Sequence, residues 1–297
     1  EWTCKASIKS NISGIAMRIE VNNTRLYVDV VGSGLVAKGP MMVERPVIFV
    51  LHGGPGFDHS TMKPAFNPLS EMSQLVYYDH RGQGRSDHDK PENWNLNQWA
   101  DDLRALIDTL GVEKPIVLGL SFGGFVAQNY AIRHPDRLHK LILASTVARM
   151  VPQRVFDAFQ KFGGDSARLA AEDFWAGPNT ENSAVYMKEC MPLYSRVEQD
   201  PDTIRRPVMA PDVISHFSRE GGENWSFDFR EQLSTIRCPT LVTAGDIDPI
   251  TPIEAVEEMA DNIPKEFVQY EVFENCGHGV HRDDPGAFEV MKKFIEQ

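Results

Sequence analysis

Runs rich in Val, Ile, Leu and aromatic residues alternate along the chain with segments of helical periodicity. Pro46–Leu51 is apolar throughout, as strands covered by helices on both faces are. The strands predicted in this way cover 46–51, 74–78, 116–118, 138–144, 239–244 and 267–273. Regular alternation of strand and helix is typical of parallel sheets. We therefore predict an α/β fold with a mostly parallel central sheet and helices on both of its faces.

The first part of the chain predicts a β-hairpin. Ile15–Val21 and Thr24–Val31 are β-rich and are joined by Asn22-Asn23, and asparagine tolerates the positive φ that such a turn needs. Lys38-Gly39-Pro40 is expected to belong to a loop that leads into the next strand. Apolar residues at helical spacing predict helices over Asn95–Leu110, Ile253–Asn262 and Pro285–Ile295. On the first of these helices, Asp101, Asp102, Arg104 and Asp108 are expected largely on the polar face.

The strand-helix rhythm stops between Pro152 and about Leu233. This stretch shows helical periodicity in three pieces, Val155–Phe162, Leu169–Trp175 and Tyr186–Tyr194, and no strand pattern. An insertion of this kind in an alternating fold predicts a helical cap over the carboxyl edge of the sheet. We therefore expect a catalytic domain made of residues 1–150 and 232–297, with a cap domain at 151–231.

The stretch Pro115–Gln128 has the pattern of a nucleophile elbow. Its glycines two residues before and two residues after Ser121 allow a sharp turn between a strand and a helix. That turn exposes the Ser121 hydroxyl and directs the N-terminal N–H groups of the following helix towards its target. The five-residue pattern alone is weak, but a predicted strand before it and a helix from Phe125 to Ile132 supply the required context. Ser121 is therefore the candidate nucleophile.

A serine nucleophile needs a base and an acid that orients the base, and after such an elbow the acid precedes the histidine along the chain. His278 and His281 are the histidines that follow the last predicted strand. We favour His278 because it lies between two glycines at the strand exit, and we expect His281 to face solvent or the rim. Asp246 and Asp248 both follow the preceding strand, and we favour Asp248 as the acid and expect Asp246 to cap backbone.

Two loops at other strand ends complete the pattern. The glycines of His52–Gly56, HGGPG, expose backbone N–H groups that can form part of an oxyanion hole together with the N–H of Phe122. A phosphate-binding loop would instead end in Gly-Lys-Ser/Thr, which is absent. The mixed charges of Asp79–Asp87 indicate a structural network, with His80 or Arg81 as less favoured substrate contacts.

Composition and charge limit the kinds of molecule that this protein is expected to bind. The formal charge of −12 and pI near 5.2, without a cluster of Lys and Arg, argue against nucleic acid and against an anionic membrane surface. No apolar run approaches the roughly 20 residues that span a bilayer. The four scattered cysteines lack metal-ligand spacing and favour free thiols, so we expect a cytoplasmic location and no metal. The sequence gives no indication of the oligomeric state.

HGGPG, DHRGQGRSD, GLSFGG, GDIDPITP and NCGHG occur in this order, with the cap between GLSFGG and GDIDPITP. This combination resembles the proline iminopeptidase branch of the α/β-hydrolase fold, over nearly the whole chain. The resemblance implies that Ser121 is the nucleophile, Asp248 the acid and His278 the base. It also implies that Gly54 and Phe122 donate the oxyanion N–H groups. Peptidases of that family grip a free amino terminus with cap carboxylates, for which Glu189, Glu220 and Glu223 are candidates.

The sequence thus predicts a cofactor-independent serine hydrolase that cleaves a small ester, amide or lactone through an acyl-enzyme. Alternatives are a proline iminopeptidase and, from another class, a non-catalytic ligand receptor on the same fold. The candidate contacts for a small-molecule substrate are a glycine of HGGPG, aromatic residues and a cap carboxylate: Gly53, Phe156, Trp175, Tyr186, Glu189, Tyr194 and Phe217. The aromatic side chains of the cap equally suit its core.

Overall fold

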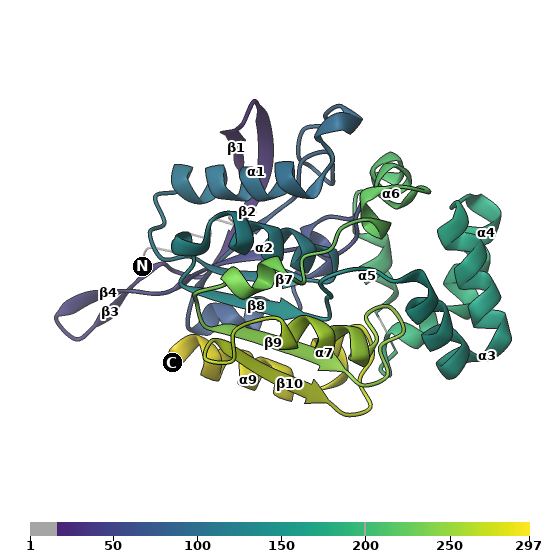
Figure 1. Ribbon diagram of the computed structural model, residues 1–297. Coiled ribbons are helices and arrows are strands. Elements are labelled where there is room, and N and C mark those ends of the chain that lie inside the picture. Colours follow the sequence, from purple (N-terminus) through teal and green to yellow (C-terminus); the bar gives the residue numbers. More distant parts are fainter. Residues whose placement is uncertain (1–16, 199) are drawn as a thin grey trace, which may run out of the picture.

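Eight strands form one sheet in the order β1-β2-β6-β5-β7-β8-β9-β10 in the computed structural model, which describes residues 17–198 and 200–297 (Figure 1). The β1-β2 and β2-β6 pairs are antiparallel and the other neighbouring pairs are parallel. The prediction of a mostly parallel α/β sheet is confirmed. The strands are β1 Met17–Val21, β2 Thr24–Val31, β5 Val47–Leu51, β6 Gln74–Tyr78, β7 Ile116–Leu120, β8 Lys140–Ala144, β9 Thr240–Gly245 and β10 Val268–Phe273.

The predicted first hairpin is present as β1 and β2. Val21 pairs with Thr24, and Asn22 and Asn23 take φ values of 43° and 60°, as a two-residue turn between antiparallel strands requires. The predicted residue Ile15 lies outside the described residues. The side-chain types at the turn were therefore sufficient to locate this hairpin.

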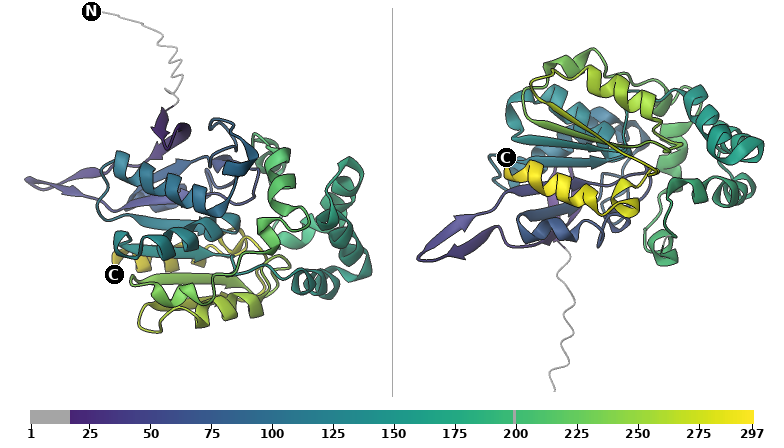
Figure 2. Two further views of the ribbon diagram at one scale, coloured as in Figure 1. Left: turned by 45° about the horizontal axis from the view of Figure 1, so that its top comes forward. Right: turned by 90° about the horizontal axis from the view of Figure 1, so that it is seen from below.

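The stretch predicted as a loop is in fact a second hairpin. β3, Leu35–Lys38, pairs antiparallel with β4, Met41–Glu44, and the two strands project away from the main sheet (Figures 1 and 2). Gly39 has a φ of 60°, and the proline ring holds φ of Pro40 near −65°. This combination is suited to a two-residue turn that begins with glycine. The prediction was wrong because Gly-Pro was interpreted as a break between elements.

Helices cover both faces of the sheet and form two separate apolar layers. α1 Leu96–Thr109, α2 Phe122–Arg133 and α7 Ile253–Asp261 pack in the layer that includes Phe49 and Val117. α9, Gly286–Glu296, packs against the opposite layer, which includes the neighbouring strand residues Val50 and Leu118 (Figure 2). Consecutive residues of one strand thus serve different faces, which explains why the strands are apolar throughout.

The segment between β8 and β9 contains helices and no strand among its described residues. α3 Pro152–Ala176, α4 Thr180–Glu189, α5 Pro201–Arg205 and α6 Pro211–Ser218 lie beyond the carboxyl ends of the parallel strands (Figure 1). α3 contains a kink at Gly164, where φ is 76°, between the two helical pieces expected from the sequence. The division into a catalytic domain and a cap stays a prediction.

Short helices complete the chain. α8 covers Val280–Asp283, and 3₁₀ turns cover η1 His59–Thr61, η2 Asn67–Glu71, η3 Pro91–Asn93, η4 Pro135–Arg137, η5 Met191–Tyr194, η6 Glu223–Trp225 and η7 Gln232–Thr235. Within the described part of the chain, no helix combines the length and the apolar character needed to cross a membrane.

A buried ion pair joins α1 to the loop after β6. The sequence placed Asp102 on the polar face of its helix, but its side chain is buried and accepts two hydrogen bonds of 2.7 Å from the guanidinium of Arg81. Arg81 also pairs with Asp89, and Asn22 donates to Asp102. The expectation failed because helical periodicity does not reveal that a cation from a distant segment, here Arg81, pairs with Asp102.

Asp102→Ala should lower the free energy of unfolding by about 3–5 kcal/mol, since it leaves the buried Arg81 without its two-pronged partner. Urea denaturation followed by circular dichroism measures the change. The matched control is Asp108→Ala on the same helix, because Asp108 pairs with arginines at the surface and should cost at most about 1 kcal/mol. Equal losses in the two variants would contradict the assignment of Arg81 and Asp102 as a buried pair.

Candidate active site

Ser121 lies at a strained turn between β7 and α2. Its φ of 54° and ψ of −121° are rare for a residue with a side chain, at a cost of roughly 1–3 kcal/mol. Hydrogen bonds offset that cost: Ser121 donates its N–H to Ala144 at 3.0 Å, and its carbonyl accepts from Gly124 N–H and the Thr146 hydroxyl, both at 2.8 Å. The turn therefore holds the serine hydroxyl in a defined place at the carboxyl end of the sheet.

The two glycines that flank the serine allow α2 to lie directly on the strands. A Cβ at Gly123 would lie 2.3 Å from the carbonyl oxygen of Leu51, and one at Gly119 would lie 2.4 Å from the carbonyl oxygen of Gly123. Real Cβ atoms do not approach so closely. α2 begins at Phe122, three residues before the predicted helix start, so its first N–H groups lie immediately next to Ser121.

His278 connects Ser121 to Asp248 in one line of hydrogen bonds. Its Nε2 lies 2.9 Å from Ser121 Oγ, and its Nδ1 lies 2.8 Å from Asp248 Oδ2. Three loops that follow β7, β9 and β10 carry these residues, so the carboxyl ends of parallel strands bring them together. The structure thus joins the residues predicted as nucleophile, acid and base.

Asp248 is held as a carboxylate by its surroundings. Burial would raise its pKa, but the His278 imidazole and several hydrogen bonds outweigh burial and keep the pKa below its ordinary value. Oδ1 accepts the N–H groups of Ile250 and Thr251, and Oδ2 accepts the Thr251 hydroxyl at 2.5 Å. An ionised Asp248 keeps the imidazole proton on Nδ1 and leaves Nε2 free to accept from Ser121. Thr251 was not among the predicted site residues, although it lies within GDIDPITP.

Asp246 and His281, the alternatives to Asp248 and His278, lie in other surroundings. Asp246 accepts a hydrogen bond from the Cys276 N–H at 3.3 Å, as expected of a backbone-capping residue. His281 does not face solvent: its side chain is buried, with its ring 4.5 Å from Phe66 and 6.2 Å from Phe288. That expectation was wrong because α8 begins directly after Gly279 and turns His281 into the apolar layer.

Two backbone N–H groups remain available beside Ser121. Phe122 N–H is the first of α2 and so has no acceptor within the helix. In the described part of the chain, neither it nor Gly54 N–H donates to a protein acceptor. Gly54 has a φ of 137°, which side chains rarely adopt, and a Cβ on the adjacent Gly53 would lie 3.6 Å from Ser121 Cβ. Free donors at this position suit the oxyanion of an acyl-transfer intermediate.

Buried polar groups hold the HGGPG turn in place. His52 Nδ1 lies 2.8 Å from the Gly53 carbonyl, and His52 Nε2 accepts the N–H of His80. Gln83 accepts the Gly56 N–H at 2.6 Å. His80 is buried among aromatic rings. Arg81 forms ion pairs with Asp89 and Asp102. We therefore assign Asp79–Asp87 to the support of the HGGPG loop. Nothing in the sequence alone could have paired Gln83 with this loop.

Aromatic side chains from the helical segment lie over the histidine. The Tyr194 ring stands edge-to-face with His278 at 5.4 Å, and its hydroxyl oxygen lies 2.7 Å from that of Tyr186. Tyr186 in turn contacts Trp175, whose ring lies 6.2 Å away and perpendicular to it. Phe156 is half-buried against the same apolar layer. Three of the proposed substrate contacts thus form one connected group next to His278.

Two proposed contacts lie elsewhere. Phe217 is fully buried against Trp99 and Phe122, so we assign it to the core and withdraw it from the substrate contacts. Glu189 forms an ion pair of 2.8 Å with the exposed Lys188 at the end of α4, which compensates its charge at the surface. Periodicity places both residues on helices but does not show which side of a helix meets the sheet edge.

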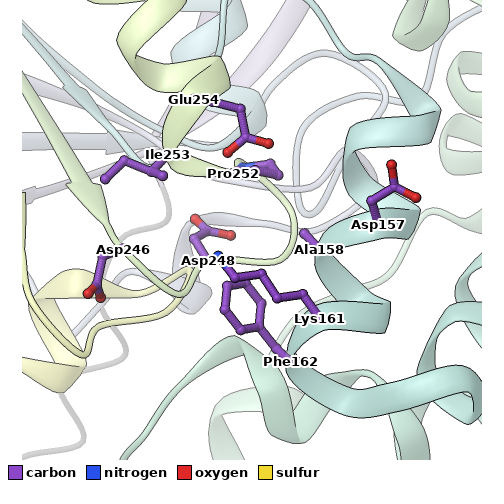
Figure 3. Close-up of a pocket in the computed structure, with 9 residues that line it drawn as sticks. All are labelled: Asp157, Ala158, Lys161, Phe162, Asp246, Asp248, Pro252, Ile253 and Glu254. Atoms are coloured by element: carbon purple, nitrogen blue, oxygen red, sulfur yellow. The ribbon is translucent and has the colours of Figure 1, made fainter.

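A small pocket of about 110 Å³ lies where α3 meets the loop that carries Asp248 (Figure 3). The α3 side chains Lys161 and Phe162 extend towards Asp248 across it (Figure 3). Its lining comprises Asp157, Ala158, Lys161, Phe162, Asp246, Asp248, Pro252, Ile253 and Glu254, and does not include Ser121 or His278. The pocket therefore adjoins Asp248 and not the Ser121 hydroxyl.

One cluster in the described residues has the spacing of a metal site: Asp58, His59 and Asp79. Its ligand atoms already have protein partners. Asp79 accepts from His59 Nδ1 and from Arg85 N–H, and Asp58 accepts from the Arg85 guanidinium and from Val208 N–H. The Arg85 guanidinium compensates the charge of Asp58, and both aspartates already accept hydrogen bonds from the protein, so we assign this cluster to the structure of the loops.

Comparison with known proteins agrees with this geometry. The family model described as alpha/beta hydrolase fold matches residues 46–285. The proline iminopeptidase PfmaB of Pestalotiopsis fici is 29% identical over 86% of this chain and 93% of its own length. RutD of Caulobacter sp. (strain K31), whose name carries a provisional assignment as a carbamate hydrolase, is 28% identical over 80% of this chain and 91% of its own.

A solved structure shows the same fold. The crystal structure of proline iminopeptidase from Mycobacterium smegmatis superposes with a TM-score of 0.75 at 23% identity, and the match covers 95% of this chain and 98% of that one. Together with the family match, this confirms the predicted α/β-hydrolase fold.

Gly123→Ala should lower kcat/KM and the thermal unfolding temperature together, because the new Cβ would push α2 away from Leu51 and displace Ser121. The expected destabilisation is about 1–3 kcal/mol. Activity on an aryl ester and a thermal melt measure the two effects. Gly177→Ala is the control, since a Cβ there meets nothing within 4 Å and the backbone is extended. Unchanged activity in Gly123→Ala would show that the close approach is not required.

Proposed function

We propose that Ser121, His278 and Asp248 are the catalytic triad of this chain, which belongs to the α/β-hydrolase fold family and is a hydrolase. In this proposal the enzyme cleaves a small ester, amide or lactone through an acyl-enzyme. The observation that carries the proposal is the continuous line of hydrogen bonds, 2.9 Å from Ser121 to His278 and 2.8 Å from His278 to Asp248.

In the first half of the reaction, Ser121 Oγ attacks the substrate carbonyl carbon while His278 Nε2 takes its proton. The imidazolium that forms is stabilised by ionised Asp248 through the Nδ1 hydrogen bond. Negative charge moves to the carbonyl oxygen, where the N–H groups of Gly54 and Phe122 receive it. Such donors are each worth roughly 10² to 10³ in rate.

Acylation is complete when His278 gives this proton to the leaving alcohol or amine as the carbon–oxygen or carbon–nitrogen bond breaks, and the acyl group stays on Ser121. In the second half, water attacks the acyl carbon while His278 removes its proton, and the acid is released as Ser121 regains its hydrogen. One water is consumed in each cycle.

The contacts of the cap carboxylates favour a hydrolase of small esters, amides or lactones over a proline iminopeptidase. Glu189 is paired with Lys188, and Glu223 accepts the N–H of Leu96 at 2.8 Å, where it caps the start of α1. Burial raises the pKa of Glu223, which disfavours a free anionic charge there. Two of the three carboxylates proposed to hold an amino terminus are thus engaged otherwise. The peptidase remains the second candidate because of HGGPG and the likeness to PfmaB.

The proposal includes a small-molecule substrate and a cytoplasmic location. Cys190, Cys238 and Cys276 are free and buried, which supports a reducing compartment. The net charge of −12 disfavours nucleic acid and anionic lipid as partners. The ligand-receptor alternative is less favoured, since a receptor has no need for a base within hydrogen-bond distance of a strained serine.

Ser121→Ala should abolish both turnover of an aryl ester and covalent labelling by a fluorophosphonate, since it removes the attacking oxygen. Mass spectrometry of the labelled wild type should place the adduct on Ser121. Ser234→Ala, which changes an exposed serine, is the control and should label normally. Labelling of another residue in the Ser121→Ala variant at the wild-type rate would refute the proposed nucleophile.

Wild-type enzyme should hydrolyse an uncharged aryl ester at a higher kcat/KM than the aryl amide of proline, because Glu189 and Glu223, two of the three candidate carboxylates for the ammonium group, are engaged by other partners. Steady-state kinetics with both substrates decide between the two candidates. A prolyl amide preferred by tenfold or more would establish the peptidase instead.

A further inference from the structure

Tyr186, which is buried, and Tyr194, which is half-buried next to His278, share one hydrogen bond but carry two hydroxyl hydrogens. The hydroxyl oxygens of Tyr186 and Tyr194 lie 2.7 Å apart. Each hydroxyl supplies one hydrogen, so whichever tyrosine donates to the other, one hydrogen is left over. Among the described residues no other side chain or carbonyl accepts from either hydroxyl. Once a bound substrate excludes water from such a donor, leaving it without an acceptor costs about 1–3 kcal/mol, so a substrate that supplies an acceptor is favoured.

Packing fixes the two rings in place. Tyr186 stacks on Phe174 at 4.3 Å and meets Phe159 edge-on at 5.9 Å. The Tyr194 carbonyl lies so close to the histidine loop that a Cβ at Gly277 would be 2.6 Å from it. Burial raises the pKa of both tyrosines, so both hydroxyls keep their hydrogens at neutral pH. The unused hydrogen is therefore a preorganised donor.

The neighbouring indole adds a further donor to this group. Trp175 Nε1 makes no hydrogen bond of standard length and acts only weakly on the Tyr186 hydroxyl, whereas Nε1 of the adjacent Trp225 donates to the Ser218 carbonyl at 2.8 Å. The group formed by Trp175, Tyr186 and Tyr194 thus has more donors than acceptors, in apolar surroundings. Such a site is complementary to an uncharged oxygen that only accepts hydrogen bonds, such as an ether or a carbonyl oxygen.

We infer that Tyr194, supported by Tyr186, binds an acceptor oxygen in the leaving group of the substrate. The inference rests on the proposed function, in which His278 gives its proton to the leaving group, and Tyr194 is the tyrosine whose ring contacts His278. The substrate class is therefore an ester or amide whose alcohol or amine part is mainly apolar and carries a second, ether-like or carbonyl oxygen.

Two esters that differ only in the replacement of one CH₂ group by an ether oxygen test the inference. Butyl and 2-methoxyethyl esters of the same acid have leaving groups of similar size, and only the second carries an ether oxygen. The ratio of their kcat/KM values is measured for wild type, Tyr194→Phe and Tyr186→Phe. The intrinsic reactivity of each ester is the same in every variant, so changes in the ratio report the protein contact alone.

Tyr194→Phe should reduce the preference for the methoxyethyl ester by about 3- to 10-fold, the range of one neutral hydrogen bond, and change kcat/KM for the butyl ester less than about twofold. Tyr186→Phe is the matched control. It removes the partner but leaves the Tyr194 hydroxyl hydrogen free, so most of the preference should remain.

Two results would overturn the inference. An equal loss on both esters in Tyr194→Phe would show a structural role, and an unchanged ratio in the Tyr186→Phe/Tyr194→Phe double variant would show that the tyrosines bind no leaving-group oxygen. Fluorophosphonate labelling of Ser121 in each variant separates these results from failure of the proposed function. Labelled enzyme without the predicted preference refutes the subsite, and wild type that is not labelled refutes the triad.

Discussion

The close approach of α2 to the sheet is the constraint on which the rest of the site depends. Gly119 and Gly123 remove the side chains that would separate the helix from β5 and from the end of β7. The short distance forces Ser121 into positive φ, and three hydrogen bonds, with Ala144 of β8, Thr146 of the loop after it and Gly124 of α2, retain it there. Both the raised hydroxyl and the free N–H of Phe122 follow from this packing, because a longer turn would separate them.

The loops around the serine are held by buried polar groups rather than by apolar contact. His52 and Gln83 fix the HGGPG turn, and the pair of Arg81 with Asp102 ties the neighbouring loop to α1. Buried charges and amides without partners are costly, so each of these loops has essentially one low-energy arrangement. The N–H groups proposed to bind the oxyanion are consequently positioned before substrate binds, as electrostatic catalysis requires. The helical segment between β8 and β9, in contrast, meets the site through aromatic rings.

Local signals predicted the frame of the fold well. Two asparagines located the first hairpin, and continuous apolar strands indicated a sheet covered on both faces. Two of the failures share one cause. Helical periodicity placed Asp102 on a polar face, and the position of His281 beyond the strand exit suggested solvent or the rim, yet both are buried by partners from distant segments, Arg81 for the first and Phe66 for the second. The Gly-Pro turn between β3 and β4 was a local signal that was misinterpreted.

The sequence by itself determined the order and spacing of the chemistry: an elbow at Ser121, acids and histidines after the next strands, and glycines after β5. These depend on backbone requirements that a few adjacent residues satisfy. Only the tertiary structure decided that Asp248 and not Asp246 meets His278, that Phe217 belongs to the core, and that Tyr186 and Tyr194 share a hydrogen bond beside the histidine. Those contacts join segments far apart in the chain, and their geometry is set by how whole elements pack, which no local pattern specifies.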